Sequence, residues 1–112
     1  MKNRFDESEL YEMKAAVMQA LAHPIRLKIV DFLADGEKCV CEIVKIVDGE
    51  RTNISKHLSI LQKADILSSR KAGLKVFYKV NMRCVSNFLS CAEEIIKYHL
   101  EKRIKLLRGV KK

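Results

Sequence analysis

The fold of this chain is decided by residues 39–64, which read CVCEIVKIVDGERTNISKHLSILQKA. Apolar residues recur at helical spacing over residues 39–47, and the Asp48-Gly49 pair that follows is a strong turn signal. A second helix is predicted over residues 52–64. Its inward-facing stripe consists of Ile54, Leu58 and Leu61. The stretch therefore predicts two short helices joined by a tight turn.

The face of residues 52–64 opposite this stripe is polar and cationic, and its side chains are mostly short. At about 100° per residue, this face carries Thr52, Lys56, Ser59 and Lys63, with Ser55 beside them. Small hydroxyl side chains let a helix approach the bases of a DNA major groove, and lysines contact phosphates. We therefore expect a DNA recognition helix. His57 lies about 60° from the apolar stripe, which favours a partly packed structural residue.

Two helices are predicted before this unit. An amphipathic helix covers about residues 8–20. His23-Pro24 then separates it from a second helix that ends near Asp35-Gly36, because proline suits the first turn of a helix. We expect His23 to be a capping or turn residue.

After residue 66 the apolar period changes from helix-like to strand-like, and residues 67–80 predict a β-hairpin around Ala72-Gly73-Leu74. The hairpin is rich in basic residues suited to the DNA backbone or minor groove. These are Arg70, Lys71, Lys75 and Lys79.

A long final helix is predicted at about residues 82–107, with Asn81 as its N-cap. Its apolar stripe is longer than one small core can cover, which is typical of a dimer surface, here shared with the helix at residues 8–20. The predicted fold is therefore a mainly α, winged helix-turn-helix domain over residues 1–112. It has about five helices and a two-stranded wing, and it dimerises through its first and last helices.

The net charge of +8 is unevenly distributed along the chain. Residues 1–50 contain 7 basic and 10 acidic residues, whereas residues 51–112 contain 15 and 4. This asymmetry favours a polyanion-binding second half, with nucleic acid as the first candidate. No signal peptide or membrane-spanning run is predicted, so a cytoplasmic protein is expected. No nucleophile–base pair or phosphate loop stands out, so we do not expect an enzyme.

Nine residues separate Cys39-Val40-Cys41 from residues 51–64, the segment that contains the predicted recognition helix. In a helix, residues two apart point about 200° away from each other. Both sulfurs can therefore bind one ion only if the backbone at Cys39-Val40-Cys41 is not helical. We expect ion binding to unwind the start of the helix. The simpler alternative is two small buried hydrophobic residues in a helix.

The chain resembles the ArsR/SmtB family of winged-helix repressors over about residues 12–100. The residues that carry this resemblance are LAHPIRL at 21–27, CVCEI at 39–43, ISKHLSIL at 54–61 and the hairpin ending in Tyr78. The resemblance implies a dimeric repressor that binds an inverted-repeat DNA operator and releases it when an inducer binds. It also places a set of residues at or near the major groove: Arg51, Thr52, Asn53, Ser55, Lys56 and Ser59. Arg51 stands where glutamine is common.

Within the family, Cys39-Val40-Cys41 resembles the arsenic-responsive branch, in which thiolates bind As(III) or Sb(III). No constitutive cofactor is implied. Val44 occupies the position of a frequent third cysteine, so the third ligand would be water, a small thiol, Cys84 or Cys91. The alternatives are a Cd/Pb-type sensor, a thiol-redox or persulfide sensor with the same fold, or a DNA-binding module that senses nothing.

Overall fold

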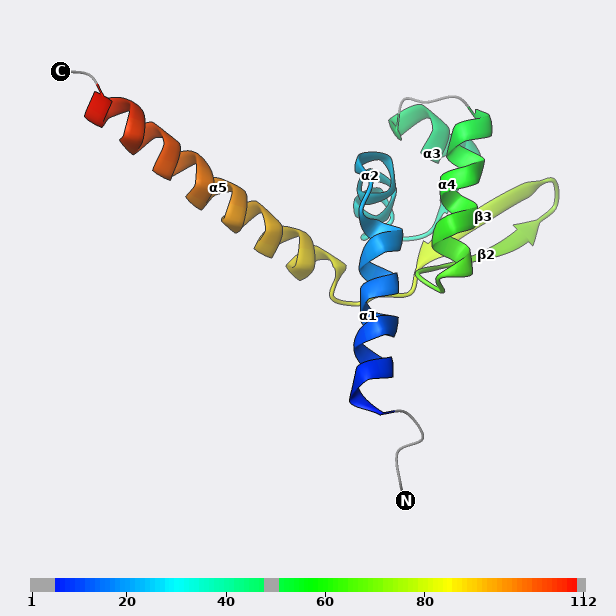
Figure 1. Ribbon diagram of the computed structural model, residues 1–112. Coiled ribbons are helices and arrows are strands. Elements are labelled where there is room, and N and C mark those ends of the chain that lie inside the picture. Colours follow the sequence, from blue (N-terminus) through cyan, green and yellow to red (C-terminus); the bar gives the residue numbers. More distant parts are fainter. Residues whose placement is uncertain (1–5, 48–50, 111–112) are drawn as a thin grey trace.

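The structure is a computed structural model that describes residues 6–47 and 51–110 (Figure 1). Five helices and three strands occur in the described part of the chain. The helices are α1 (Glu7–Leu21), α2 (Pro24–Phe32), α3 (Val40–Val47), α4 (Arg51–Lys63) and α5 (Val85–Val110), and the strands are β1 (Lys38–Cys39), β2 (Leu67–Ala72) and β3 (Lys75–Val80). This architecture confirms the predicted mainly α class with a hairpin wing. The turn predicted at Asp48-Gly49 lies outside the described residues.

The first two helices begin at side-chain caps. Asp6 accepts a hydrogen bond from the Glu9 N–H at 2.8 Å, and Glu9 accepts one from the Asp6 N–H, which forms a capping box. At α2, the Nδ1 atom of His23 accepts a hydrogen bond from the Ile25 N–H at 3.1 Å, and Pro24 occupies the first turn. The capping role predicted for His23 is therefore confirmed.

The core lies where α2, α3 and α4 meet the base of the sheet. The predicted stripe of α4 is buried, since Ile54, Leu58 and Leu61 are each at most 1% exposed. They join a cluster of buried apolar side chains from the other elements. Its members include Ile29, Leu33, Ile43, Val47, Ile66, Leu67 and Val85. The position of α4 is thus fixed by burial of one face, which leaves its other face free.

The sheet has one strand more than the sequence predicted. Its order is β1-β3-β2, and β1 pairs antiparallel with β3, with Lys38 opposite Tyr78 and Cys39 opposite Phe77. The prediction that α3 begins at Cys39 is therefore wrong by one residue, because the backbone of Cys39 is paired in the sheet. A two-residue strand has no apolar periodicity, so the sequence pattern did not reveal it.

The predicted capping role of Asn81 is also wrong. The Asn81 side chain donates to the Asp65 carbonyl at 2.9 Å and accepts from the Ser68 hydroxyl at 2.8 Å. Asp65 has a left-handed backbone (φ 62°) in the turn that ends α4, where an aspartate is tolerated and glycine is usual. Asn81 therefore stabilises the junction between α4 and the wing, and α5 begins later, at Val85, after Cys84.

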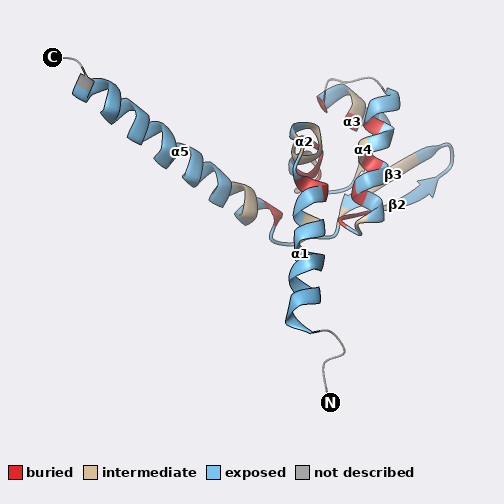
Figure 2. Ribbon diagram, viewed as in Figure 1, coloured by how far each residue is buried: buried red, intermediate tan, exposed pale blue. Residues whose placement is uncertain are grey.

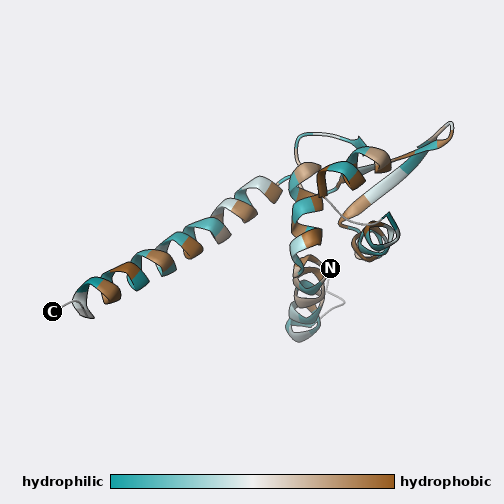
Figure 3. Cartoon of the chain, turned by 90° about the horizontal axis from the view of Figure 1, so that it is seen from above, coloured by the Kyte–Doolittle hydropathy of each residue, from teal (hydrophilic) through white to brown (hydrophobic). Residues whose placement is uncertain are grey.

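Helix α5 leaves the core after its first turns and projects away from the other helices (Figures 1 and 2). Bands of hydrophobic residues recur along it in Figure 3. Its exposed large apolar residues are Ile95, Ile96, Tyr98, Leu100, Ile104, Leu106 and Leu107, and those of α1 are Leu10, Tyr11, Met13 and Met18. Ile95 and Leu107 are 69% and 71% exposed, so this chain alone does not cover the stripe. No helix in the described part is both long enough and apolar enough to cross a membrane.

Replacing Asn81 tests its reassigned role. We expect Asn81→Ala to lower the free energy of unfolding by about 1–2 kcal/mol, because two hydrogen bonds are lost at roughly 1 kcal/mol each. Urea unfolding measures this change. The helical circular dichroism signal should stay unchanged below the transition, whereas loss of an N-cap would reduce it. Asn81→Asp is the matched variant, because it retains the acceptor for Ser68 and loses only the donor to Asp65.

Candidate nucleic-acid interface and thiol site

The exposed face of α4 carries all the residues predicted to contact the major groove. Each of them is solvent-exposed, while the apolar stripe on the other side is buried. These exposed residues are Arg51, Thr52, Asn53, Ser55, Lys56, Ser59 and Lys63. The face is cationic and contains no carboxylate, which suits contact with a polyanion. Contact with DNA itself stays a prediction.

The wing is attached directly to α4. Gln62 donates from Nε2 to the Ser69 hydroxyl of β2 at 3.0 Å. Beyond this contact, β2 and β3 pair at six positions, out to Ala72 opposite Lys75. Lys71 and Lys75 are exposed near the end of this hairpin, as predicted. The hydrogen bond between Gln62 and Ser69 therefore holds the base of the basic hairpin against the end of α4.

Arg70 is the predicted DNA residue whose setting differs most from expectation. Its guanidinium donates from Nε and from one Nη to the two carboxylate oxygens of Glu37, both at 2.8 Å, and lies 4.9 Å from the centre of the Phe77 ring. The hydrogen bonds from Arg70 lower the pKa of the Glu37 carboxyl. Arg70 therefore forms an ion pair with Glu37 across the sheet and is not an unpaired cation in this structure. No local pattern in the sequence indicates this partner, since Glu37 and Arg70 are 33 residues apart.

The side chain of His57, on α4, is half-buried against the start of α2, as predicted for a structural histidine. Its ring centre lies 4.4 Å from that of His23, and its Nδ1 atom is buried without a hydrogen-bond partner in the described chain. Burial lowers the pKa of His57, and the nearby His23 and Arg26 lower it further. The neutral imidazole is therefore the form that the fold favours at this position of α4.

The two thiols of Cys39 and Cys41 are already in contact. Their sulfur atoms lie 2.6 Å apart, with Cys39 buried and Cys41 exposed. The expectation that a regular α3 holds the sulfurs apart is therefore wrong. Because Cys39 lies in β1 and only Cys41 lies in the helix, the 200° separation of helical residues does not apply.

Cys39 also caps α3. Its sulfur accepts from the Cys41 N–H at 3.4 Å, and the Glu42 carboxylate accepts from the Cys39 N–H at 3.0 Å. The Glu42 carboxylate thus bonds back to the N–H of the residue before the helix, as in a capping box, while the Cys39 sulfur accepts from the N–H of the second helical residue. A glutamate three residues after Cys39 is the signal in the sequence that would have identified this role. Cys39 is thus both a member of the thiol pair and the N-cap of α3.

The electrostatics make the two cysteines unequal. The hydrogen bond from the Cys41 thiol lowers the pKa of Cys39, and the backbone N–H groups of Cys41 and Glu42, with the Lys75 charge, lower it further. The pKa of Cys41 is raised, chiefly because its thiol is hydrogen-bonded to the Cys39 sulfur. Of the two thiols, Cys39 is therefore the one whose thiolate form is favoured.

No third protein ligand completes the site within one chain. Among the described residues, no group of three His, Cys, Asp or Glu side chains is arranged to hold a metal ion. Cys84 and Cys91 are free and exposed, at the start of α5 and along it. No group of that kind includes either of them among the described residues, and their role as a third ligand stays a prediction.

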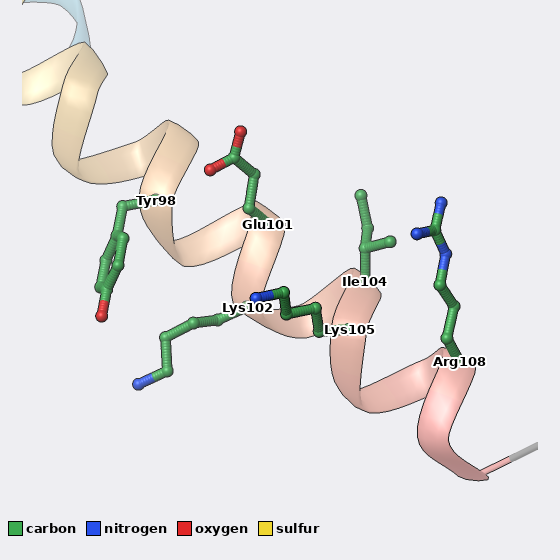
Figure 4. Close-up of a pocket in the computed structure, with 6 residues that line it drawn as sticks. All are labelled: Tyr98, Glu101, Lys102, Ile104, Lys105 and Arg108. Carbon is green, nitrogen blue, oxygen red and sulfur yellow. The ribbon is translucent and has the colours of Figure 1, made fainter.

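A hollow on α5 is the other feature that resembles a site (Figure 4). It is lined by Tyr98, Glu101, Lys102, Ile104, Lys105 and Arg108. All six belong to one helix, so no second element encloses the hollow. It therefore offers no built binding site within this chain.

The fold and the exposed face of α4 together define a winged helix-turn-helix DNA-binding domain. Residues 23–69 match a family model described as bacterial regulatory protein, arsR family. The chain is 36% identical over 88 residues to an uncharacterized HTH-type transcriptional regulator of Methanocaldococcus jannaschii, with 78% of this chain and 99% of that protein covered. The chain belongs to the ArsR family of transcriptional regulators.

Two further proteins are similar to this chain, one in sequence and one in structure. The arsenical resistance operon repressor of Staphylococcus xylosus is 30% identical over 71 residues, which cover 63% of this chain and 68% of that protein. A homodimeric winged helix-turn-helix DNA-binding domain from Mycobacterium bovis is similar in structure, with a TM-score of 0.72 and 28% identity. The match covers 91% of this chain and 95% of that domain. The family of regulators is thereby shown, and the arsenic-responsive branch stays a prediction.

The setting of His57 predicts a pH dependence of stability. Its folded-state pKa lies below the ordinary value of about 6.5, so the unfolded state binds a proton more readily. The contribution of His57 is complete above about pH 6.5 and is lost as the pH falls below it. Urea unfolding at fixed protein concentration, between about pH 7.5 and 5.5, should show stability falling by at most about 1.4 kcal/mol per pH unit from this group. His57→Gln should flatten the profile, whereas His99→Gln, an exposed histidine on α5, should not.

The Glu37–Arg70 pair predicts a change in salt dependence. We expect Glu37→Gln to free the Arg70 guanidinium for a phosphate, so that the slope of log K against log salt for duplex DNA steepens by about 0.9. Unfolding free energy should change by less than about 1 kcal/mol, because the pair is exposed. Asp35→Asn is the control, because it removes the same charge from an exposed carboxylate that pairs with Lys38. An equal steepening of this slope in both variants would contradict a specific role for the Glu37–Arg70 pair.

Proposed function

We propose that this chain is a cytoplasmic, homodimeric repressor that releases operator DNA when As(III) or Sb(III) binds Cys39 and Cys41. In the DNA-bound state, α4 occupies the major groove of each half of an inverted repeat, and the wing contacts the adjacent backbone. The observation that carries the proposal is the contact of the two sulfurs, 2.6 Å apart, at the start of a helix that packs against α4.

The donor set supports a soft, thiophilic inducer. Two sulfurs converge at one point without an imidazole, and thiolate donors select soft ions over Mg²⁺ or Ca²⁺. The lowered pKa of Cys39 favours formation of a thiolate there, and ion binding displaces the proton of the other thiol. The relative from Staphylococcus xylosus, a repressor of an arsenical resistance operon, supports the same class of inducer.

A third donor must come from outside the described single chain, if the ion takes three ligands. Water, a small cellular thiol, or Cys84 or Cys91 of a second copy are the candidates. Cys84 directly precedes α5, Cys91 lies on it, and both are exposed. Because α5 is proposed to form the dimer, a cysteine of the second copy is a testable third donor.

The dimer is supported by the uncovered apolar faces of α1 and α5. Exposed side chains such as Ile95, Leu100 and Leu107 form a stripe along a helix that projects from the core (Figure 3). A long exposed apolar stripe on a soluble domain is typical of an interface. The similar domain from Mycobacterium bovis is homodimeric, in agreement with this proposal.

Release follows from the two roles of Cys39. When a ligand takes its sulfur lone pairs, the hydrogen bond from the Cys41 N–H is weakened and the start of α3 loses its cap. Helix α3 buries Ile43 and Val47 in the same cluster as Ile54 and Leu58 of α4, so a shift of α3 moves the recognition helix. A 10- to 100-fold loss of DNA affinity requires the ligand to favour the released state by about 1.4–2.8 kcal/mol.

Thiol oxidation is the second candidate trigger. The lowered pKa of Cys39 and the adjacent Cys41 resemble a redox-sensing pair, in which a thiolate reacts and a neighbouring thiol resolves the product. Oxidant or persulfide, rather than a metalloid, would then release DNA. A Cd(II)- or Pb(II)-type response is the remaining alternative among soft ions.

The deciding experiment measures binding to a duplex selected in vitro from a random-sequence pool. We expect As(III) to weaken binding of the reduced wild-type protein by about 10- to 100-fold. Cys39→Ser/Cys41→Ser should bind the duplex as tightly as wild type, because serine retains the cap, and should not respond to As(III). Fluorescence anisotropy measures both, in parallel with Cd(II) and peroxide arms.

The control is Cys84→Ser/Cys91→Ser. A retained response in this variant assigns the third donor to solvent or a small thiol, whereas a lost response assigns it to α5. If the Cys39→Ser/Cys41→Ser variant still responds to As(III), the proposed site is wrong. If peroxide releases the DNA and As(III) at full thiol occupancy does not, redox sensing replaces the proposal.

A further inference from the structure

The tip of the wing presents a leucine that the fold does not use. Ala72 pairs with Lys75, so Gly73 and Leu74 alone form the turn of the hairpin. Leu74 has a relative exposure of 103%, the largest among the exposed large apolar residues of the described chain. Its side chain is therefore as accessible as in an extended peptide and buries nothing within this chain.

The turn itself requires the glycine and not the leucine. Gly73 has φ 65°, and a Cβ atom at this position would meet nothing within 4 Å, so the backbone conformation is what demands glycine. Among non-glycine residues in the described chain, only Asp65 has a positive φ, so Leu74 adopts an ordinary one. Nearly any residue fits such a position, and polar residues are usual in turns.

The surroundings of Leu74 are cationic. Residues 67–80 contain four basic side chains and no carboxylate. Lys71 and Lys75 are exposed on either side of the tip. An apolar side chain between two cations matches a partner that combines phosphates with an apolar recess, and the groove of a DNA duplex combines both.

The length of the wing matches the distance between neighbouring grooves. Each strand has six residues, which extend about 20 Å at roughly 3.4 Å per residue. The wing begins at α4 through Gln62 and Ser69, so a helix in the major groove brings the tip near the adjacent minor groove. That groove lies about 17 Å along the axis, half of a turn of roughly 34 Å.

We propose that Leu74 inserts as an apolar wedge into the minor groove of the operator DNA, while Lys71 and Lys75 contact the phosphates on its two sides. The inference rests on the proposed DNA binding and adds a contact that reads DNA shape. Leucine neither donates nor accepts a hydrogen bond, so it selects base steps that open easily. Pyrimidine–purine steps such as TA unstack most readily, and A·T pairs lack the guanine amino group that crowds the minor groove.

Salt dependence separates a wedge from a phosphate contact. We expect Leu74→Ser to weaken binding to the selected duplex by about 10-fold without changing the slope of log K against log salt, because leucine releases no counterion. Lys71→Ala and Lys75→Ala should each weaken binding and make the slope shallower by about 0.9. Leu74→Met should retain most of the affinity, and Ala72→Ser is the control for a polar change at the same tip.

A base analogue reports the insertion directly. With 2-aminopurine placed at the TA step under the wing, wild-type protein should raise its fluorescence by unstacking the base, and Leu74→Ser should not. Replacing the TA step by a G·C-rich step should weaken wild-type binding and leave Leu74→Ser nearly unaffected.

The proposal is overturned if Leu74→Ser binds the selected duplex as wild type does, or if its loss of affinity is accompanied by a shallower slope. It is also overturned if Leu74→Ser changes the sedimentation of the free protein and leaves DNA affinity intact, since the tip would then contact protein. Failure of the wild type to bind any duplex would instead contradict the proposed function. Thermal unfolding should be unchanged in Leu74→Ser, because the side chain is fully exposed.

Discussion

The pairing of Cys39 with Phe77 is the constraint on which the candidate sites depend. It holds the backbone of Cys39 in the sheet, so that α3 begins at the next residue and the Cys39 sulfur caps it. It also keeps Cys39 outside the helix, and this is why the sulfur can meet that of Cys41. The same pairing attaches the wing to the segment that precedes α3. One strand of two residues thus joins the thiol pair to the wing.

The sequence predicted those parts of the fold that repeat a pattern. The stripe of Ile54, Leu58 and Leu61, the strand-like period after residue 66 and the Gly73 turn each follow local rules, and each is found in the structure. Contacts between distant residues were missed. Glu37 meets Arg70 and Asn81 meets Asp65 only after the sheet has formed, and β1 is too short to show a period. For the candidate site, residue types were predictable and the sulfur geometry was not.

The acidic and basic halves of the chain form different elements of the structure. The basic second half supplies α4, the wing and α5, while the described acidic residues of the first half lie on or next to α1, α2 and α3 and before β1. Glu37 brings one of these acids to the wing and holds Arg70 at the base of the sheet. The unpaired cations that remain near the tip are Lys71 and Lys75, so positive charge is concentrated where the hairpin is farthest from the core.

The size of the elements decides how a change at Cys39 reaches DNA. Helix α3 has eight residues and is too short to be stable alone, so it depends on its cap and on the burial of Ile43 and Val47. The wing hairpin has six paired positions, against two in the pairing of β1 with β3. Helix α4 has 13 residues and a fully buried stripe. Under the proposed mechanism, loss of the cap therefore displaces α3 while α4 and the wing stay formed. Release of DNA would then follow from a changed position of these two elements relative to each other, because a dimer must fit both half-sites at once.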